Sequence, residues 1–231
     1  MSKHGKKHSK RKRRLPKRLL IIPNADKKFH EKWRPGRDPL DIPHPFRACL
    51  MGPPHSGKTL AIKNIILRCK PTFDRVIVIH GLGDSTREYD DIDPEMVTSD
   101  MPPMKFFKEI DSKCLVILDD IDFKGLTKHD SHILNRLYGT LSTHNNISVI
   151  NATQDMFQLP PIVRRCSNFY ILWRPAELNG LSVMARKAGI RTHKLLELFE
   201  NHCPGTHDSV WVDKTEHTPF PIRINGYKMV E

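Results

Sequence analysis

Short apolar runs alternate with segments of helical spacing along most of the chain. The segment DRVIVIH at 74–80 is an apolar run of strand length, and so is the start of CLVILDDID at 114–122. Between residues 58 and 70 the apolar side chains instead recur on one face of a helix. This alternation is typical of a parallel sheet covered by helices. It predicts strands at 46–51, 74–80, 114–122, 147–154, 168–173, 208–213 and 220–225. It predicts helices at 58–70, 103–110, 131–144, 176–188 and 192–201.

The positive charge of the chain is concentrated at its N-terminus. Residues 1–18 contain ten Lys or Arg and no acidic residue, so subtracting these from the net charge of +12 leaves +2 for the other 213 residues. We predict a disordered basic tail at 1–28, because this segment is poor in large apolar side chains. Four prolines predict an extended lead-in at 29–45, and a single folded domain should occupy 46–231.

The cysteines predict reduced intracellular thiols. All five lie at least 20 residues apart, with no CxxC spacing. The stretch HCPGTH contains His202, Cys203 and His207 but offers no fourth ligand at zinc spacing, so we interpret it as a helix terminus and a turn. The apolar run Leu19–Ile22 has four residues, too few for a signal peptide or a membrane span. We therefore expect a soluble protein without membrane insertion.

The stretch GPPHSGKT at 52–59 has the spacing of a phosphate-binding loop. It follows a predicted buried strand and opens a predicted helix, the context that such a loop requires. Its glycines let backbone N–H groups approach the β-phosphate, and the helix N-terminus adds partial positive charge. Lys58 should reach the β- and γ-phosphate oxygens of ATP, and Thr59 should coordinate Mg²⁺. The alternative is a glycine-rich turn without a ligand. The predicted nucleotide-binding residues are Gly52, Pro53, Pro54, His55, Ser56, Gly57, Lys58 and Thr59.

Two acidic residues end the apolar run LVIL. Asp119 lies at the carboxyl end of the predicted strand, where it can hold Mg²⁺ directly or through water. Asp120 is the candidate for polarising the attacking water. An acidic residue directly after the Mg²⁺ ligand favours ATP hydrolysis over a GTPase arrangement. The alternative for Asp120 is an N-cap or a solvated acid, and Asp122 is interpreted as a turn residue.

The stretch from 147 to 165 supplies three further catalytic candidates. Gln154, at the tip of a predicted strand, is the expected sensor of the γ-phosphate, and Asn151 is less favoured because it falls earlier in the strand. The alternative for Gln154 is a loop-capping amide. Arg164 and Arg165 precede the next strand and are candidates for an arginine finger acting on a neighbouring subunit, unless they belong to a solvated basic turn.

Three stretches carry a family resemblance. MGPPHSGKT, VILDDID and STHNNISVINATQDMFQLPPIVRRCSNFYILWRP together resemble the poxvirus-type genome-packaging ATPases of large DNA viruses, which are members of the FtsK/HerA superfamily. The resemblance covers about residues 46–225. The segment LPPIVRR is rich in proline where the family has a more polar segment, which leaves open whether Arg164 or Arg165 is the finger.

The resemblance implies a three-layer αβα, RecA-like P-loop ATPase that assembles as a homo-oligomeric ring, a pentamer or hexamer. Such a ring would pump double-stranded DNA into a preformed capsid, with capsid or vertex proteins as partners. The resemblance also supports Gln154 as the sensor and an arginine after it as the finger. It implies a location at the viral assembly site, in the host nucleus or cytoplasm, and association with the virion.

Two other functions fit the same nucleotide motifs. A cellular-type DNA-dependent ATPase, such as a helicase loader or a remodelling ATPase, would share the ATP site but need no capsid. A nucleotide-gated binding module with little turnover is disfavoured by the joint presence of Lys58, Thr59, Asp119 and Asp120. The basic tail could bind DNA, direct nuclear import or dock on the capsid, and its composition does not separate these roles.

Overall fold

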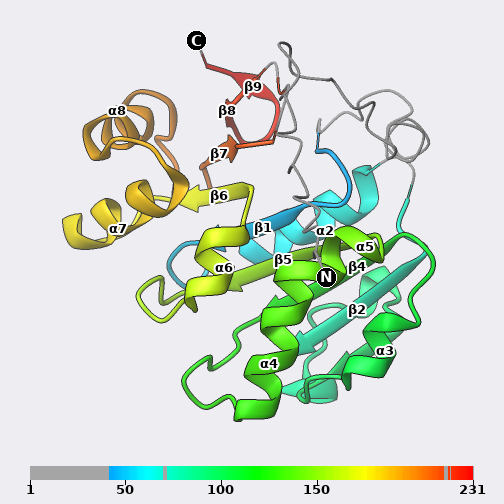
Figure 1. Cartoon of the computed structure of the whole chain (residues 1–231). Coiled ribbons are helices and arrows are strands. Elements are labelled where there is room, and N and C mark those ends of the chain that lie inside the picture. The colour runs from blue at the N-terminus through cyan, green and yellow to red at the C-terminus, as the bar shows by residue number, and fades with distance from the viewer. Residues whose placement is uncertain (1–41, 70–71, 216–217, 219, 231) are drawn as a thin grey trace, which may run out of the picture. The chain divides into compact units, whose positions relative to one another are not determined.

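The central feature of the molecule is one sheet of nine strands (Figure 1). The computed structural model describes residues 42–69, 72–215, 218 and 220–230. The strand order is β3-β2-β4-β5-β1-β6-β7-β8-β9. The strands are β1 Arg47–Met51, β2 Arg75–His80, β3 Met96–Thr98, β4 Cys114–Asp119, β5 Ile147–Thr153, β6 Phe169–Trp173, β7 Ser209–Asp213, β8 Ile222–Ile224 and β9 Lys228–Met229.

The sheet is mostly parallel, as the alternating pattern predicts. The six strands from β3 to β6 in this order pair parallel, and β7, β8 and β9 extend the sheet antiparallel. Every residue of β4 is buried, which explains its continuous apolar run. In the register of the sheet Asp119 lies beside His80 of β2 and Ala152 of β5. The carboxyl ends of these strands therefore meet at one edge.

Helices cover both faces of the sheet. Ile62 and Ile65 of α2 pack on one face, whereas α3, α4, α6, α7 and α8 contribute to the apolar cluster on the opposite face. Figure 1 shows α7 and α8 side by side next to β6. The helices are α2 Lys58–Arg68, α3 Met104–Lys108, α4 Lys128–Arg136, α5 Ser142–His144, α6 Pro161–Cys166, α7 Leu178–Ala188 and α8 Thr192–His202, with short turns η1 Gly83–Ser85, η2 Asp90–Ile92 and η3 Leu137–Leu141.

Three differences from the predicted elements have local causes. The helix expected at 131–144 begins earlier, at Lys128, because Thr127 caps it by accepting a hydrogen bond from the backbone N–H of Asp130. Its second half is a π-helical turn followed by α5. The segment PPIVRRC contains α6, which starts with Pro161 at its first position, where a proline costs no hydrogen bond. The strands β3 and β9 have three and two residues, too few to produce a pattern.

The N-terminal predictions fall mainly outside the described residues. The tail at 1–28 and residues 29–41 of the lead-in are not described. Of the remaining lead-in, Ile42 and His44 are buried beside Phe46, and His44 Nδ1 pairs with Ser148 Oγ at 2.7 Å. None of the helices in the described part of the chain is both long and apolar enough to cross a membrane.

Candidate active site

The loop between β1 and α2 has a backbone suited to phosphate. His55 and Gly57 adopt left-handed conformations, with φ of 58° and 101°, and alternation of this kind turns successive N–H groups toward one point. The Ser56 hydroxyl is buried, and no described residue hydrogen-bonds to it. At Gly52 a Cβ would lie 2.8 Å from both Ser56 Oγ and Trp173 Cβ. The loop therefore needs glycine at this close approach, and it keeps a buried polar atom available to a ligand.

Lys58 stabilises the same loop from inside. Its ammonium donates to the carbonyl oxygens of Gly52 at 3.1 Å and Pro53 at 2.8 Å. Burial lowers the pKa of Lys58, and the carboxylates of Asp120 and Asp119 act in the opposite direction. The two hydrogen bonds hold the Lys58 amine at the loop, where it can stabilise the charge of a triphosphate.

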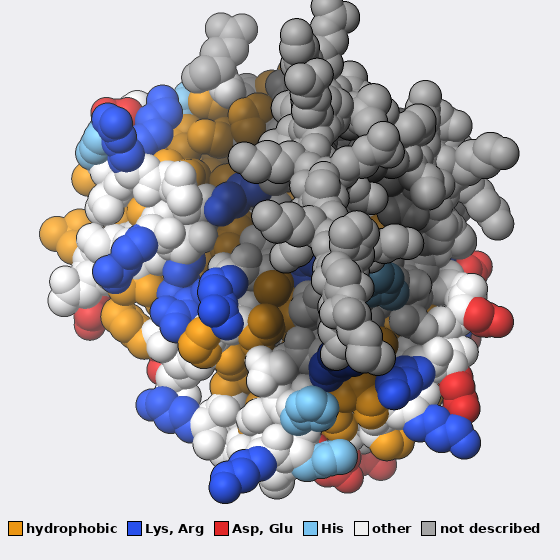
Figure 2. All heavy atoms as spheres, viewed as in Figure 1, with side chains coloured by type: hydrophobic (Ala, Val, Ile, Leu, Met, Phe, Trp, Pro, Cys, Tyr) orange, Lys and Arg blue, Asp and Glu red, His pale blue; other side chains and the backbone are white. Residues whose placement is uncertain are grey.

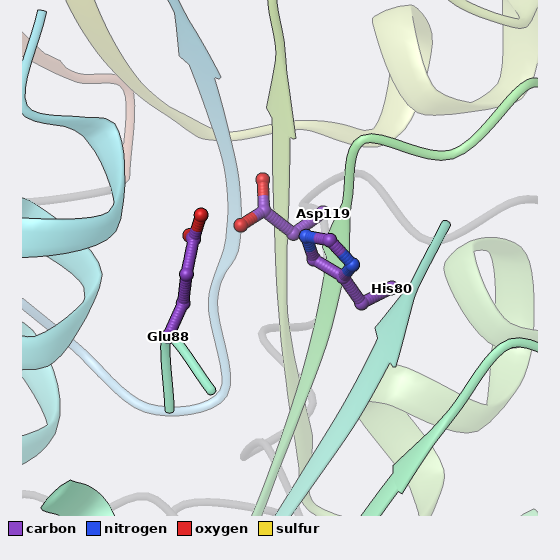
Figure 3. Close-up of side chains that lie close together, drawn as sticks. All are labelled: His80, Glu88 and Asp119. Carbon is purple, nitrogen blue, oxygen red and sulfur yellow. The ribbon is translucent and has the colours of Figure 1, made fainter. Parts of the chain in front are cut away.

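Asp119 belongs to a cluster that could hold a cation. Ligand atoms of His80, Glu88 and Asp119 all lie within 4.8 Å of one another (Figure 3). The Glu88 carboxylate also accepts a hydrogen bond from Thr59 Oγ1 at 3.2 Å. His80 Nδ1 already accepts the backbone N–H of Leu82 at 3.0 Å. The oxygen ligands that a cation would find here belong to Thr59, Glu88 and Asp119. Carboxylate and hydroxyl oxygens are the ligands that suit Mg²⁺.

Tyr89 fixes the orientation of the Asp119 carboxylate. Its hydroxyl donates to Asp119 Oδ2 at 2.5 Å, and both side chains are buried. Burial raises the pKa of Asp119, whereas the hydrogen bond from Tyr89 lowers it. A buried carboxylate of this kind gains from a neighbouring cation, so the residues present fit a magnesium ion.

Asp120 and Gln154 face each other at the edge of the sheet. Gln154 Nε2 donates to both carboxylate oxygens of Asp120 at 3.2 Å. Asp120 has φ of 49°, an uncommon conformation for a residue other than glycine. Gly81 allows it, because a Cβ there would lie 2.6 Å from the Asp120 carbonyl oxygen. Strand β5 lies between β1 and β4, which places Gln154 between the phosphate loop and the acidic pair.

One cavity collects most of the predicted site. It has a volume of about 420 Å³ and includes Glu88, which sequence patterns did not single out. Asn151 is fully buried within β5 and does not line it. Asp122 accepts the backbone N–H of Lys124, as expected of a turn residue. The predicted residues lining the cavity are Pro54, His55, Ser56, Gly57, Lys58, Thr59, Asp119, Asp120 and Gln154.

Arg164 and Arg165 lie elsewhere in this subunit. They belong to α6 and line a different cavity of about 530 Å³, together with Phe157 of the preceding loop. Within one chain they are therefore not grouped with the phosphate loop. That either arginine acts as a finger on a neighbouring subunit stays a prediction.

An apolar cavity adjoins the phosphate loop on the other side. It has a volume of about 320 Å³ and shares Gly57 and Leu60 with the first cavity. Trp211 and Tyr227 line it from the antiparallel extension of the sheet. His207 also lines it, and its Nδ1–H donates to the Ser56 carbonyl at 3.3 Å. These residues carry no motif, and only the folding of the C-terminal strands against α2 places them here.

Glu88, Tyr89 and His80 were likewise not found from the sequence. They lie on β2 and on the segment after it, 30 residues or more before Asp119. The only available signal was the acidic composition of REYDD, which is equally typical of a solvated turn. The stretch HCPGTH is a helix terminus as expected, since α8 ends at His202.

Comparison with known proteins identifies the domain. The family model described as "ATPase family associated with various cellular activities (AAA)" matches residues 48–174, more than half of the 231-residue chain. The chain belongs to this family of P-loop ATPases. The matched segment contains the phosphate loop, both acidic residues, Gln154 and both arginines of α6. Among curated proteins no match was found.

Solved structures with a similar fold include viral packaging proteins and a conjugation coupling protein. The genome-packaging NTPase B204 of Sulfolobus turreted icosahedral virus 2, in complex with AMPPCP, is 19% identical with a TM-score of 0.54, over 81% of this chain and 100% of that one. The DNA-packaging ATPase B204 of Sulfolobus turreted icosahedral virus is 18% identical with a TM-score of 0.57, over 80% and 97%. The pCW3 conjugation coupling protein TcpA with ATPγS is 13% identical with a TM-score of 0.53, over 74% and 58%. At these identities the likeness establishes the fold.

Proposed function

We propose that this protein is an ATP-driven double-stranded DNA translocase that packages a viral genome into a preformed capsid. The observation that carries the proposal is the cavity in which Lys58, Asp119, Asp120 and Gln154 meet. The sequence resemblance to poxvirus-type packaging ATPases of the FtsK/HerA superfamily supports the DNA substrate. The fold shared with two viral packaging ATPases and a conjugation coupling protein supports it further.

The residues of the cavity divide the work of ATP hydrolysis. The loop 52–57 surrounds the phosphates with N–H groups, and Lys58 neutralises their charge. Thr59 and Asp119 would hold Mg²⁺, and Glu88 lies close enough to assist. When bound, the ion would neutralise charge on the phosphates. Asp120 orients the attacking water and accepts its proton. Gln154, hydrogen-bonded to Asp120, detects whether the γ-phosphate is present.

The apolar cavity beside the loop suits the base of ATP. A purine has flat apolar faces, and Trp211 and Tyr227 line a cavity that shares Gly57 with the phosphate site. The nucleoside would thus lie between α2 and the antiparallel strands. Tyr227 and Leu60 are 70% and 65% exposed, so the rim can adjust as the base enters.

A ring, a pentamer or hexamer, completes the proposal. Arg164 or Arg165 would reach the ATP of the neighbouring subunit as the finger. The ring would act with capsid or vertex proteins at the viral assembly site, in the host nucleus or cytoplasm, and associate with the virion.

Two measurements test the function. Lys58→Ala should abolish Mg²⁺-ATPase activity, whereas the control Lys194→Ala, at an exposed lysine, should retain it. Duplex DNA at low salt should stimulate the activity of the wild type. Electron microscopy with an ATP analogue and DNA should show a closed ring around the duplex. Activity without any effect of DNA would contradict the translocase. DNA-stimulated activity without a ring would instead favour a helicase loader or remodelling ATPase.

The finger is tested separately by mixing subunits. Arg164→Ala and Arg165→Ala chains are each combined with Asp120→Asn chains, and turnover of the mixture is measured. A chain that lacks the finger can still hydrolyse its own ATP when its neighbour supplies one. If both arginine variants keep full turnover alone and in mixtures, neither residue is a finger.

A further inference from the structure

Four cationic side chains line the cavity between α6 and α7, which is separate from the ATP site. Arg164 and Arg165 come from the last turn of α6, and Arg186 and Lys187 from the last turn of α7. With Phe157 they line a volume of about 530 Å³. Figure 2 shows Lys and Arg side chains gathered at the left of the view, where Figure 1 draws these two helices. Nothing in the ATPase site described above uses Arg186, Lys187 or Phe157.

Helix electrostatics account for only part of this arrangement. Cations in the last turn of a helix are stabilised by the partial negative charge of its C-terminus. That explains exposed arginines at the ends of α6 and α7. It does not explain why two such ends converge on one cavity, since like charges brought together repel.

Lys187 has a buried ammonium group without a hydrogen-bond acceptor among the described residues. Burial lowers its pKa to about 8, and the charges of Arg164 and Arg186 act in the same direction. The carboxylate of Asp155 and the thiol of Cys49 oppose this effect. A buried ammonium without an acceptor is costly, and an anion inside the cavity would supply the missing acceptor.

We propose that this cavity binds a phosphate of the DNA backbone. The inference rests on the proposed function and names the surface that contacts the translocated duplex. Phosphodiester groups protrude from a duplex, so one of them can enter a cavity that Lys187 and three arginines line. Phe157, with 63% of its surface exposed at the cavity, adds an apolar face for the adjoining sugar or base.

A nucleotide held by a neighbouring subunit fits the buried lysine less well. Its phosphates would lie within that neighbour's own phosphate loop, where an outward-reaching arginine can approach them. They cannot at the same time enter a cavity of this chain. A cavity within this chain therefore favours the duplex, while Arg164 and Arg165 at the exposed surface stay available as finger candidates.

A short, hydrogen-bonded turn connects this cavity to the ATP site. Gln154 contacts Asp120, and Phe157 follows three residues later. The Asp155 carboxylate accepts the backbone N–H of Phe157 at 2.8 Å and the side-chain amide of Gln158 at 2.5 Å, and these two hydrogen bonds stabilise the turn. Movement of Gln154 on loss of the γ-phosphate would thus displace Phe157 against bound DNA.

The test measures binding of a random-sequence duplex by the full chain across a salt series. Fluorescence anisotropy compares the wild type with Lys187→Met, Phe157→Ala and the control Lys194→Met, which changes an exposed lysine on α8. Losing one phosphate contact should weaken the salt dependence of Lys187→Met by about 0.9 in the slope of log affinity against log salt. Phe157→Ala should weaken binding without changing the slope, and Lys194→Met should match the wild type.

Three results would overturn the site. A wild-type slope in Lys187→Met, with DNA binding intact, removes this cavity and leaves the translocase proposal standing. Absence of duplex binding by the wild type removes both. The third result is that Lys187→Met binds DNA like the wild type but loses its turnover without DNA, and that mixing with Asp120→Asn chains restores this turnover. It would assign the cavity to a neighbour's nucleotide instead. Thermal unfolding of Lys187→Met confirms that the variant is folded.

Discussion

Replacing Tyr89 by Phe tests whether a residue without a motif holds the acidic strand end in place. The change removes one hydroxyl and keeps the ring, so packing is preserved. The lost hydrogen bond joins Tyr89 Oη to Asp119 Oδ2 at 2.5 Å, between side chains of residues that are 1% and 3% exposed. A hydrogen bond to a charged group contributes about 1.5–3 kcal/mol. At roughly 2–4 °C per kcal/mol for a domain of this size, Tm should fall by roughly 3–12 °C.

Activity should change in the same variant. Without its donor the Asp119 carboxyl has a pKa raised further, because burial already favours its neutral form. The Mg²⁺ concentration for half-maximal ATPase activity should therefore rise. Differential scanning calorimetry and a Mg²⁺ titration measure the two effects, and Tyr227→Phe, which removes an exposed hydroxyl, is the control for the change in Tm.

A double-mutant cycle measures how much of this stability depends on the charge of Asp119. In an Asp119→Asn background the hydroxyl meets a neutral amide, so Tyr89→Phe should then cost about 1 kcal/mol. An unchanged Tm in the single variant, or an equal loss in both backgrounds, would show that the bond to a charged carboxylate does not stabilise this site.

Three further substitutions give distinct expectations. Gly52→Ala would place a Cβ 2.8 Å from Ser56 Oγ and Trp173 Cβ, so calorimetry should show a loss of about 1–3 kcal/mol and ATP titration a weaker affinity. The control Gly139→Ala meets nothing nearer than 4.0 Å and should not be destabilised. Glu88→Gln should raise the Mg²⁺ concentration needed for activity and leave Tm unchanged. The control Glu197→Gln, at an exposed residue of α8, should change neither quantity. Lys187 has a pKa of about 8 when folded, below its ordinary 10.5, so the unfolded chain binds more protons between these values and stability should rise with pH there. Lys187→Met should lose that rise, and its free energy of unfolding at pH 7 should be about 1 kcal/mol higher, a figure reduced for solvent screening of a partly exposed side chain. Free energies of unfolding in urea that do not change with pH in either protein would contradict this expectation.

The fold was predictable where local patterns coincide with burial. Strands such as β4 are apolar throughout because both faces of a parallel sheet are covered, and α2 shows helical spacing because one side packs on that sheet. The very short β3 and β9 carry too few residues for a periodicity. The helix α6 was missed because prolines indicate a turn in a sequence, although one of them starts a helix here.

The sequence by itself determined the chemistry that depends on contiguous residues. The phosphate loop works through adjacent backbone groups, and Asp119 and Asp120 are neighbours at the end of one strand, so both are visible as motifs. Only the tertiary structure decided which distant side chains join them. Glu88 and Tyr89 reach Thr59 and Asp119 because the segment after β2 lies against the end of β4. A contact between residues far apart in the chain leaves no local periodicity. For that reason the cavity lined by α6 and α7, with the buried Nζ of Lys187, also emerged only when the two helices were placed together.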